Sequence, residues 1–127
     1  MSSKKSVVLV DDEEDILAIL KAGLERNNYE VFDFDNPLKA VEYLRSVNSP
    51  QILITDIRMP GMSGFEVCRE ARMKHPEMGI IVMTSFDIDK SEFERVFPST
   101  KIDALIKKPV SIRKLIDAIN AIYVSKR

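Results

Sequence analysis

Short apolar runs alternate with amphipathic segments along the chain, and polar or turn-forming residues follow each run. An uninterrupted apolar run is typical of a strand that is covered on both faces, whereas apolar residues repeated every three or four positions indicate a helix with one buried side. The two patterns alternate five times. They predict strands at 7–10, 29–34, 52–56, 80–84 and 104–106.

Capping and turn residues set the limits of the helices between these strands. The first is expected to start within the acid run Asp11–Asp15 and to end at Asn27-Asn28, since acids suit a first helical turn. The second opens at Asn36-Pro37. Its buried side is expected to carry Leu38, Val41 and Leu44. The third helix is expected to bury Phe65, Cys68 and Ala71 and to end near His75-Pro76. The last helix, 112–124, is expected to be capped by Ser111 and to bury Ile112, Leu115, Ile116 and Ile119.

The segment from Ser85 to Lys101 is the least regular part of the chain. Ser91-Glu-Phe-Glu94 resembles a capping box, and Phe93, Val96 and Phe97 follow at helical spacing. Pro98 has no N–H to continue a helix. The segment therefore predicts a short fourth helix that begins near Ser91 and stops before Pro98.

Strands that alternate with helices imply a parallel sheet, and right-handed crossovers place helices on both of its faces. We therefore expect an α/β fold with a doubly wound five-stranded parallel sheet, in the flavodoxin-like strand order 2-1-3-4-5. In that order the carboxyl ends of the strands share one edge, which is where such sheets bind ligands.

Polar residues stand at the ends of four predicted strands: Asp11 and Asp12, Asp56, Thr84, and Lys108. Three carboxylates and one ammonium carry a formal charge of −2, which is unfavourable at close range without a counter-ion. Oxygen ligands favour Mg²⁺ (or Mn²⁺), which commonly bridges protein carboxylates to phosphate oxygens. The pattern therefore indicates phosphoryl transfer, with the Asp56 carboxylate as the nucleophile.

Composition narrows the class of protein. A chain of 127 residues with 45% hydrophobic residues fits one domain, 1–127, and a net charge of −1 argues against nucleic acid as the primary ligand. The apolar run Val7–Val10 is too short for a signal peptide or a membrane span, so we expect a cytoplasmic protein. Cys68 is expected to be a small buried hydrophobe and His75 a solvated surface residue.

Taken together, these motifs resemble the response regulator receiver domain of two-component signalling, the family of the bacterial chemotaxis response regulator. The resemblance covers essentially the whole chain. It is carried by the acid pair after the first strand, by Asp56 with Met59-Pro60-Gly61 and Gly64 behind it, by Thr84-Ser85, and by Lys108-Pro109.

The resemblance implies a signalling switch that catalyses only its own phosphorylation and dephosphorylation. Asp56 would take a phosphoryl group from a sensor histidine kinase. Mg²⁺ would be held by Asp12, Asp56 and the backbone carbonyl of Arg58, with Asp11 acting mainly through a metal-bound water. Lys108 would contact the phosphoryl group, Thr84 would turn its hydroxyl toward it, and the Lys108-Pro109 bond would be cis. An unknown output protein would bind the face made by the fourth helix, the fifth strand and the last helix.

Some positions depart from the family. Leu105 stands where the family usually has Tyr or Phe, and Ser99–Asp103 replaces a small Gly-Ala turn. We hypothesise that Arg58, at a variable family position, alters access of the hydrolytic water. Two other classes fit the sequence less well. A Mg²⁺-dependent phosphatase with an aspartyl nucleophile usually has a second acid where Arg58 stands, and a flavin-binding module needs a phosphate loop after the first strand, where this chain has acids.

Overall fold

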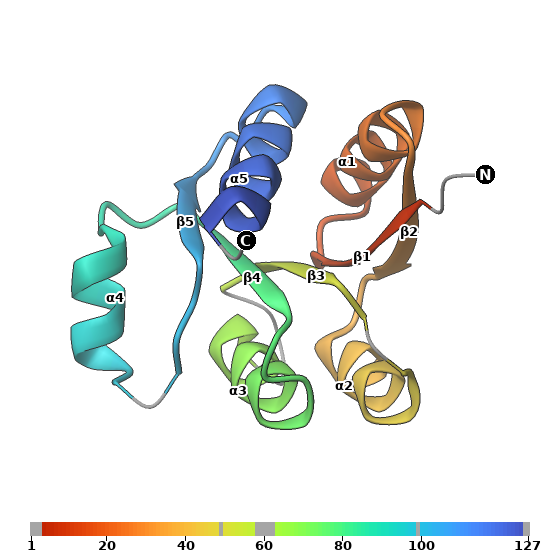
Figure 1. Ribbon diagram of the computed structural model, residues 1–127. Coiled ribbons are helices and arrows are strands. Elements are labelled where there is room, and N and C mark those ends of the chain that lie inside the picture. Colours follow the sequence, from red (N-terminus) through yellow and green to blue (C-terminus); the bar gives the residue numbers. More distant parts are fainter. Residues whose placement is uncertain (1–3, 49, 58–62, 99, 126–127) are drawn as a thin grey trace.

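Strands and helices alternate strictly along the chain, as the hydrophobic pattern predicts (Figure 1). The computed structural model describes residues 4–48, 50–57, 63–98 and 100–125. Every predicted strand and helix is present within one or two residues of its expected limits. The elements are β1 (Lys5–Val10), α1 (Glu14–Arg26), β2 (Tyr29–Phe34), α2 (Pro37–Ser46), β3 (Ile52–Asp56), α3 (Gly64–Lys74), β4 (Gly79–Thr84), α4 (Lys90–Val96), β5 (Ala104–Lys107) and α5 (Ile112–Ser125).

The strands form a parallel sheet in the order β2-β1-β3-β4-β5, which confirms the predicted order. The register aligns Val10 of β1 with Thr55 of β3, and it pairs Asp56 at the end of β3 with Met83 of β4. Thr84 pairs in turn with Lys107 of β5. The strand ends that carry the candidate site are therefore adjacent along one edge of the sheet.

Each face of the sheet packs against its own layer of helices. Helices α1 and α5 lie on one face, and α2 and α3 lie on the other (Figure 1). Alternate residues of β1 enter different cores, because Val7 and Leu9 pack with α1 and α5 whereas Val8 and Val10 pack with α2 and α3. Both faces of the central strands are thus buried, and burying one such side chain contributes about 1.5–3 kcal/mol.

The buried side of α2 differs from the prediction at one residue. Val41 and Leu44 are buried as expected, but Leu38 is 53% exposed and Pro37 and Ala40 are buried in its place. Asn36 caps this helix through its side chain, and Pro37 is the first helical residue. Positions 37, 40, 41 and 44 then form one stripe at helical spacing, and Leu38 lies outside that stripe.

The short helix α4 exists, but its N-cap is not Ser91. The Asp89 carboxylate accepts a hydrogen bond from the Glu92 N–H at 2.8 Å, and the Glu92 carboxylate accepts one from the Asp89 N–H at 3.3 Å. This pair is the capping box of α4, two residues earlier than predicted. The helix ends at Val96, before Pro98, as expected.

Arg72 of α3 fixes the connection between α4 and β5, where the sequence departs from its family. Its guanidinium donates hydrogen bonds to the main-chain carbonyl of Lys101 at 3.1 and 2.9 Å and to the Asp103 carboxylate at 3.3 Å. It also donates to the carbonyls of Pro76 and Met78, both at 2.8 Å. The Arg72 guanidinium therefore links Lys101 and Asp103 to the loop that leads into β4.

Candidate functional site

The predicted site residues meet at the carboxyl edge of the sheet, at the ends of four different strands. Asp11 and Asp12 follow β1, Asp56 is the last residue of β3, Thr84 is the last residue of β4, and Lys108 follows β5. Asp11 is held there by its main-chain N–H, which donates to the carbonyl of Phe34 at 3.1 Å. Because the strands are tightly packed, the residues at their carboxyl ends have little freedom to move apart.

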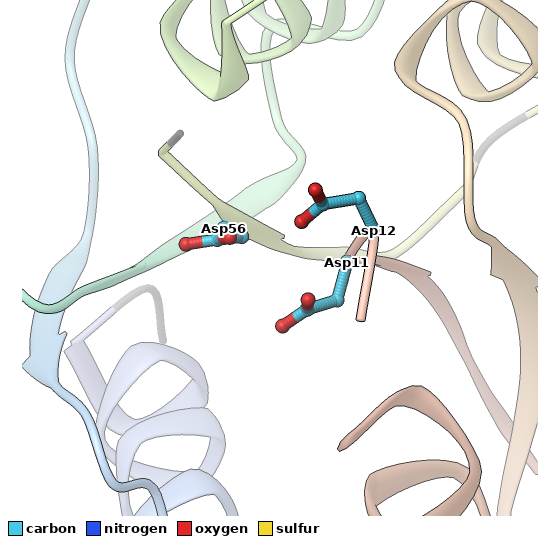
Figure 2. A group of neighbouring side chains, drawn as sticks. All are labelled: Asp11, Asp12 and Asp56. Carbon is cyan, nitrogen blue, oxygen red and sulfur yellow. The ribbon is translucent and has the colours of Figure 1, made fainter. Parts of the chain in front are cut away.

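The three aspartates form one compact cluster (Figure 2). One carboxylate oxygen from each of Asp11, Asp12 and Asp56 lies within 4.8 Å of the other two. Asp11 is fully buried and Asp56 is 6% exposed, whereas Asp12 is the least buried of the three. The cluster therefore offers three oxygen ligands, with its open side at Asp12.

Lys108 provides the positive charge beside this cluster. Its Nζ lies 3.1 Å from Asp11 Oδ2 and 3.4 Å from Asp56 Oδ2, and its side chain is 13% exposed. The main-chain N–H of Lys108 donates to the Thr84 carbonyl at 2.7 Å, which positions it against β4. The Lys108-Pro109 bond is cis, as the resemblance implied.

Burial and neighbouring charges shift the pKa values of this pair. Burial raises the pKa of the Asp56 carboxyl above its ordinary value, and the Asp11 charge adds to this, although Lys108 and the Ile57 N–H oppose it. Burial alone would lower the pKa of Lys108, but the hydrogen bond and charge of Asp11, together with Asp56, raise it. Lys108 is therefore firmly cationic, while ionised Asp56 is destabilised in the absence of a cation.

Asp11 is already held by two protein donors. Its Oδ1 accepts a hydrogen bond from the Glu13 main-chain N–H at 2.9 Å, and its Oδ2 accepts one from Lys108. Asp56 Oδ1 accepts from the Ile57 N–H at 2.9 Å. Within the described part of the chain, no donor to the Asp12 carboxylate is found, so Asp12 is the acid with most freedom to take a cation.

Thr84 lies at the same edge, with its hydroxyl oriented by the next loop. Its side chain is 1% exposed, and Oγ1 accepts a hydrogen bond from the Phe86 N–H at 2.9 Å. The hydroxyl proton remains available for another acceptor, since a hydroxyl both donates and accepts. Phe86 and Ile88, which follow, are 42% and 37% exposed.

Part of the predicted site lies outside the described residues, namely Arg58 with the turn Met59-Pro60-Gly61. The carbonyl ligand from Arg58 stays a prediction. Gly64, the second described residue after this gap, lies against the end of β3, because its N–H donates to the Ile57 carbonyl at 2.8 Å. A Cβ added at Gly64 would overlap the main-chain carbonyl of Asp56, so this close approach requires glycine.

Sequence reasoning missed one contact and misjudged another residue. Glu13 Oε1 lies 3.5 Å from Lys108 Nζ, a contact that the predicted site, with only Asp11 and Asp12 from the acid run, does not include. His75 is not a freely solvated residue, because it is half-buried and its Nε2 lies 2.6 Å from the Leu44 carbonyl oxygen. Cys68 is fully buried as predicted, and burial raises the pKa of its thiol to about 12.

The donor set fits Mg²⁺. Three carboxylates, each offering one oxygen, match a hard cation that takes few protein carboxylates and keeps several waters. The cation would also offset the formal charge of −2 that the acids and Lys108 leave.

None of the helices in the described residues is long and apolar enough to cross a bilayer.

Comparison with known proteins gives one consistent result. The family model of the response regulator receiver domain matches residues 7–120. A receiver domain protein from Clostridium thermocellum is 27% identical, with a TM-score of 0.83 over 96% of each chain. A CheY-like receiver domain protein from Methanospirillum hungatei JF-1 is 28% identical, with a TM-score of 0.82 over 94% of this chain and 93% of that one.

A third structure was solved with ligands. The response regulator protein TrrA from Thermotoga maritima, in complex with Mg²⁺ and BeF, is 30% identical to this chain. The match has a TM-score of 0.79 and covers 93% of this chain and 98% of TrrA.

Proposed function

Because this chain belongs to the family of response regulator receiver domains, we propose that it is a phosphorylation-switched signalling module in which Asp56 accepts a phosphoryl group from a sensor histidine kinase. The observation that carries the proposal is the cluster of Asp11, Asp12 and Asp56, whose carboxylate oxygens lie within 4.8 Å of one another. The Lys108 ammonium forms ion pairs with Asp11 and Asp56 of this cluster. We assign the receiver domain to residues 1–127, since β1 starts at Lys5 and α5 continues to Ser125.

Asp56 is the nucleophile in this proposal. One carboxylate oxygen attacks the phosphorus of a phosphohistidine, the new P–O bond forms, and the P–N bond breaks. The imidazole nitrogen of the donor leaves with the electron pair and takes up a proton from solvent. In the reverse direction of the switch, water attacks the phosphorus, and Asp56 leaves as a carboxylate with release of inorganic phosphate.

Asp12 and Asp56, with the backbone carbonyl of Arg58, would hold Mg²⁺ or Mn²⁺. When bound, the cation withdraws negative charge from the phosphoryl oxygens. The hydrogen bonds to both oxygens of Asp11 support an indirect role for that residue through a metal-bound water. The complex of TrrA with Mg²⁺ and BeF is a parallel from a 30% identical relative.

Lys108 and Thr84 would stabilise the new charge on Asp56. Lys108 Nζ is 3.4 Å from Asp56 Oδ2, close enough to pair with a phosphoryl oxygen bound there. Thr84 keeps a hydroxyl proton to donate, because its oxygen already accepts from the Phe86 N–H. Moving toward the phosphoryl group, Thr84 would pull on the loop that follows it.

That loop would carry the change to the binding surface. Residues Phe86 and Ile88 are exposed, and Asp87 forms an ion pair with Lys107 of β5 at 3.4 Å. Leu105 is partly buried and packs against the core on the α4 side. Because its side chain is aliphatic, it cannot act as a rotating aromatic ring. We therefore assign the change to the loop itself, on the face made by α4, β5 and α5, where an output protein would bind.

Mass spectrometry after treatment with acetyl phosphate and Mg²⁺ tests this function. We expect the wild-type protein to gain one phosphoryl group and Asp56→Asn to gain none, whereas Asp35→Asn, at an exposed position, labels like wild type. Labelling of Asp56→Asn at wild-type level would contradict the assignment. Sustained turnover of a phosphoester, in place of stoichiometric labelling, would favour the phosphatase alternative.

A further inference from the structure

A fourth carboxylate reaches Lys108 from outside the cluster of three aspartates. Glu13 Oε1 lies 3.5 Å from Lys108 Nζ, and the Glu13 side chain is 60% exposed whereas that of Lys108 is 13% exposed. Glu13 therefore approaches the ammonium from its solvent side. Nothing in the roles assigned above uses this side chain.

The backbone explains why the Glu13 carboxylate is available for this contact. Glu13 occupies the N-cap position of α1 with extended backbone angles, but its side chain makes no capping hydrogen bond. Its main-chain N–H instead donates to Asp11 Oδ1 at 2.9 Å. The main chain of Glu13 thus fixes Asp11, while its side chain extends to Lys108.

This arrangement divides one ammonium among three carboxylates, at 3.1 Å from Asp11, 3.4 Å from Asp56 and 3.5 Å from Glu13. A phosphoryl group arriving at Asp56 must attract the same ammonium. Glu13 opposes its arrival by competing for Lys108 and by repelling the negative charge of the donor. The competition for Lys108 and the repulsion both matter more as the negative charge of the phosphodonor increases. At equal separation, Glu13 repels a dianion twice as strongly as a monoanion.

We infer that Glu13 sets the preference of Asp56 among phosphodonors by disfavouring free dianionic donors relative to monoanionic ones. Glu13 is a positioning residue, since it acts through Lys108 and its own field and touches no reacting atom. The inference rests on the proposed transfer to Asp56. A donor carried on a docked protein has further contacts that offset the repulsion, so Glu13 would limit labelling by small acyl phosphates in particular.

The rates of phosphorylation by two small donors test this role. Acetyl phosphate is a dianion at neutral pH and phosphoramidate a monoanion. In the presence of Mg²⁺, we expect Glu13→Gln to raise the second-order rate constant for acetyl phosphate about threefold, within the range for an exposed ion pair, and that for phosphoramidate by less than about twofold. Higher ionic strength should shrink the difference, because salt screens an exposed charge.

Two further variants separate this effect from a general change of charge or structure. Glu14→Gln removes the same charge from the next residue, which is exposed at the start of α1, and it should leave the ratio of the two rate constants unchanged. Glu13→Asp keeps the charge, so its ratio should stay closer to that of wild type than the ratio of Glu13→Gln does. Equal unfolding midpoints of the variants would show that the fold is intact.

The possible outcomes distinguish this inference from the function on which it rests. If the wild-type protein is labelled at Asp56 by both donors but the ratio does not change in Glu13→Gln, the role of Glu13 is wrong and the receiver function stands. The same holds if Glu14→Gln changes the ratio as much as Glu13→Gln. If neither donor labels wild-type Asp56, the proposed function fails, and the inference fails with it.

Discussion

Replacing Asp56 by Asn is expected to stabilise the protein against unfolding when no divalent cation is present. The variant removes a charge that is 6% exposed and lies among other acids. Asn keeps an oxygen that can accept the hydrogen bond from the Ile57 N–H, so this contact is preserved. The fold therefore loses an unfavourable charge and little else.

The size of the effect follows from three charge contacts. Asp11 and Asp12 each approach Asp56 within 4.8 Å and repel it, whereas Lys108 attracts it at 3.4 Å. With an effective dielectric constant of about 20, each repulsion is about 3.5 kcal/mol and the attraction about 4.9 kcal/mol. The free energy of unfolding should therefore rise by about 2 kcal/mol in Asp56→Asn, before any relief of burial is added.

Urea denaturation of both proteins at neutral pH, in a chelating buffer, measures this difference. The difference in free energy of unfolding between the two proteins should become smaller as the pH falls. Because the pKa of Asp56 is raised in the folded state, the folded protein binds more protons than the unfolded chain between the ordinary and the raised pKa. Wild-type stability therefore gains on acidification through that window, since protonation removes the same charge as the substitution.

Magnesium should reverse the order of stability. At about 100 times its dissociation constant, a ligand that binds only the folded state adds about 2.7 kcal/mol, and Asp56→Asn should gain much less because it has lost one ligand. Asp35→Asn is the matched control, with the same chemical change at an exposed position. The reasoning would be refuted if Asp56→Asn were less stable than wild type without cation, or if Asp35→Asn gained as much as Asp56→Asn.

Three other substitutions test the packing around the site and the corrected helix cap. Gly64→Ala should lower the free energy of unfolding by about 2 kcal/mol, measured in urea, because the new Cβ overlaps the carbonyl of Asp56. Arg72→Met should lower it by about 2 kcal/mol and speed amide hydrogen exchange in the segment before β5, since it removes hydrogen bonds to three main-chain carbonyls. Asp89→Ala should lose about 1 kcal/mol in thermal unfolding, whereas Ser91→Ala should change little; equal losses would return the cap to Ser91.

The receiver-like site was predictable because its residues occupy the ends of strands that the sequence makes easy to find. Val7–Val10 is an uninterrupted apolar run, and Ile52–Thr55 consists of three apolar residues and a β-branched threonine; both runs are buried in the structure. The residue after such a run falls at the sheet edge whatever the details of packing. Asp11 and Asp56 could therefore be assigned to one edge before any distance was known.

Local patterns were less reliable where two similar signals competed. Ser91 and Asp89 are both good N-cap residues, and each has a glutamate three residues later. Leu38 is apolar at a plausible helical position, yet the rotation of α2 was set by Pro37 and by how the helix meets the sheet. In both cases the sequence limited the choice to a few residues, and packing selected among them.

The sequence alone determined the order of elements, the two-sided burial of the central strands and the kind of chemistry at their ends, since each depends on neighbours within a few positions. Only the tertiary structure decided which charges touch. Lys108 meets Asp11 and Glu13 across more than 90 residues of chain because β1 and β5 are brought to the same edge by β3 and β4 between them. A distance of 3.1 or 3.5 Å between such side chains depends on the register of every strand in between, and no local pattern encodes that register.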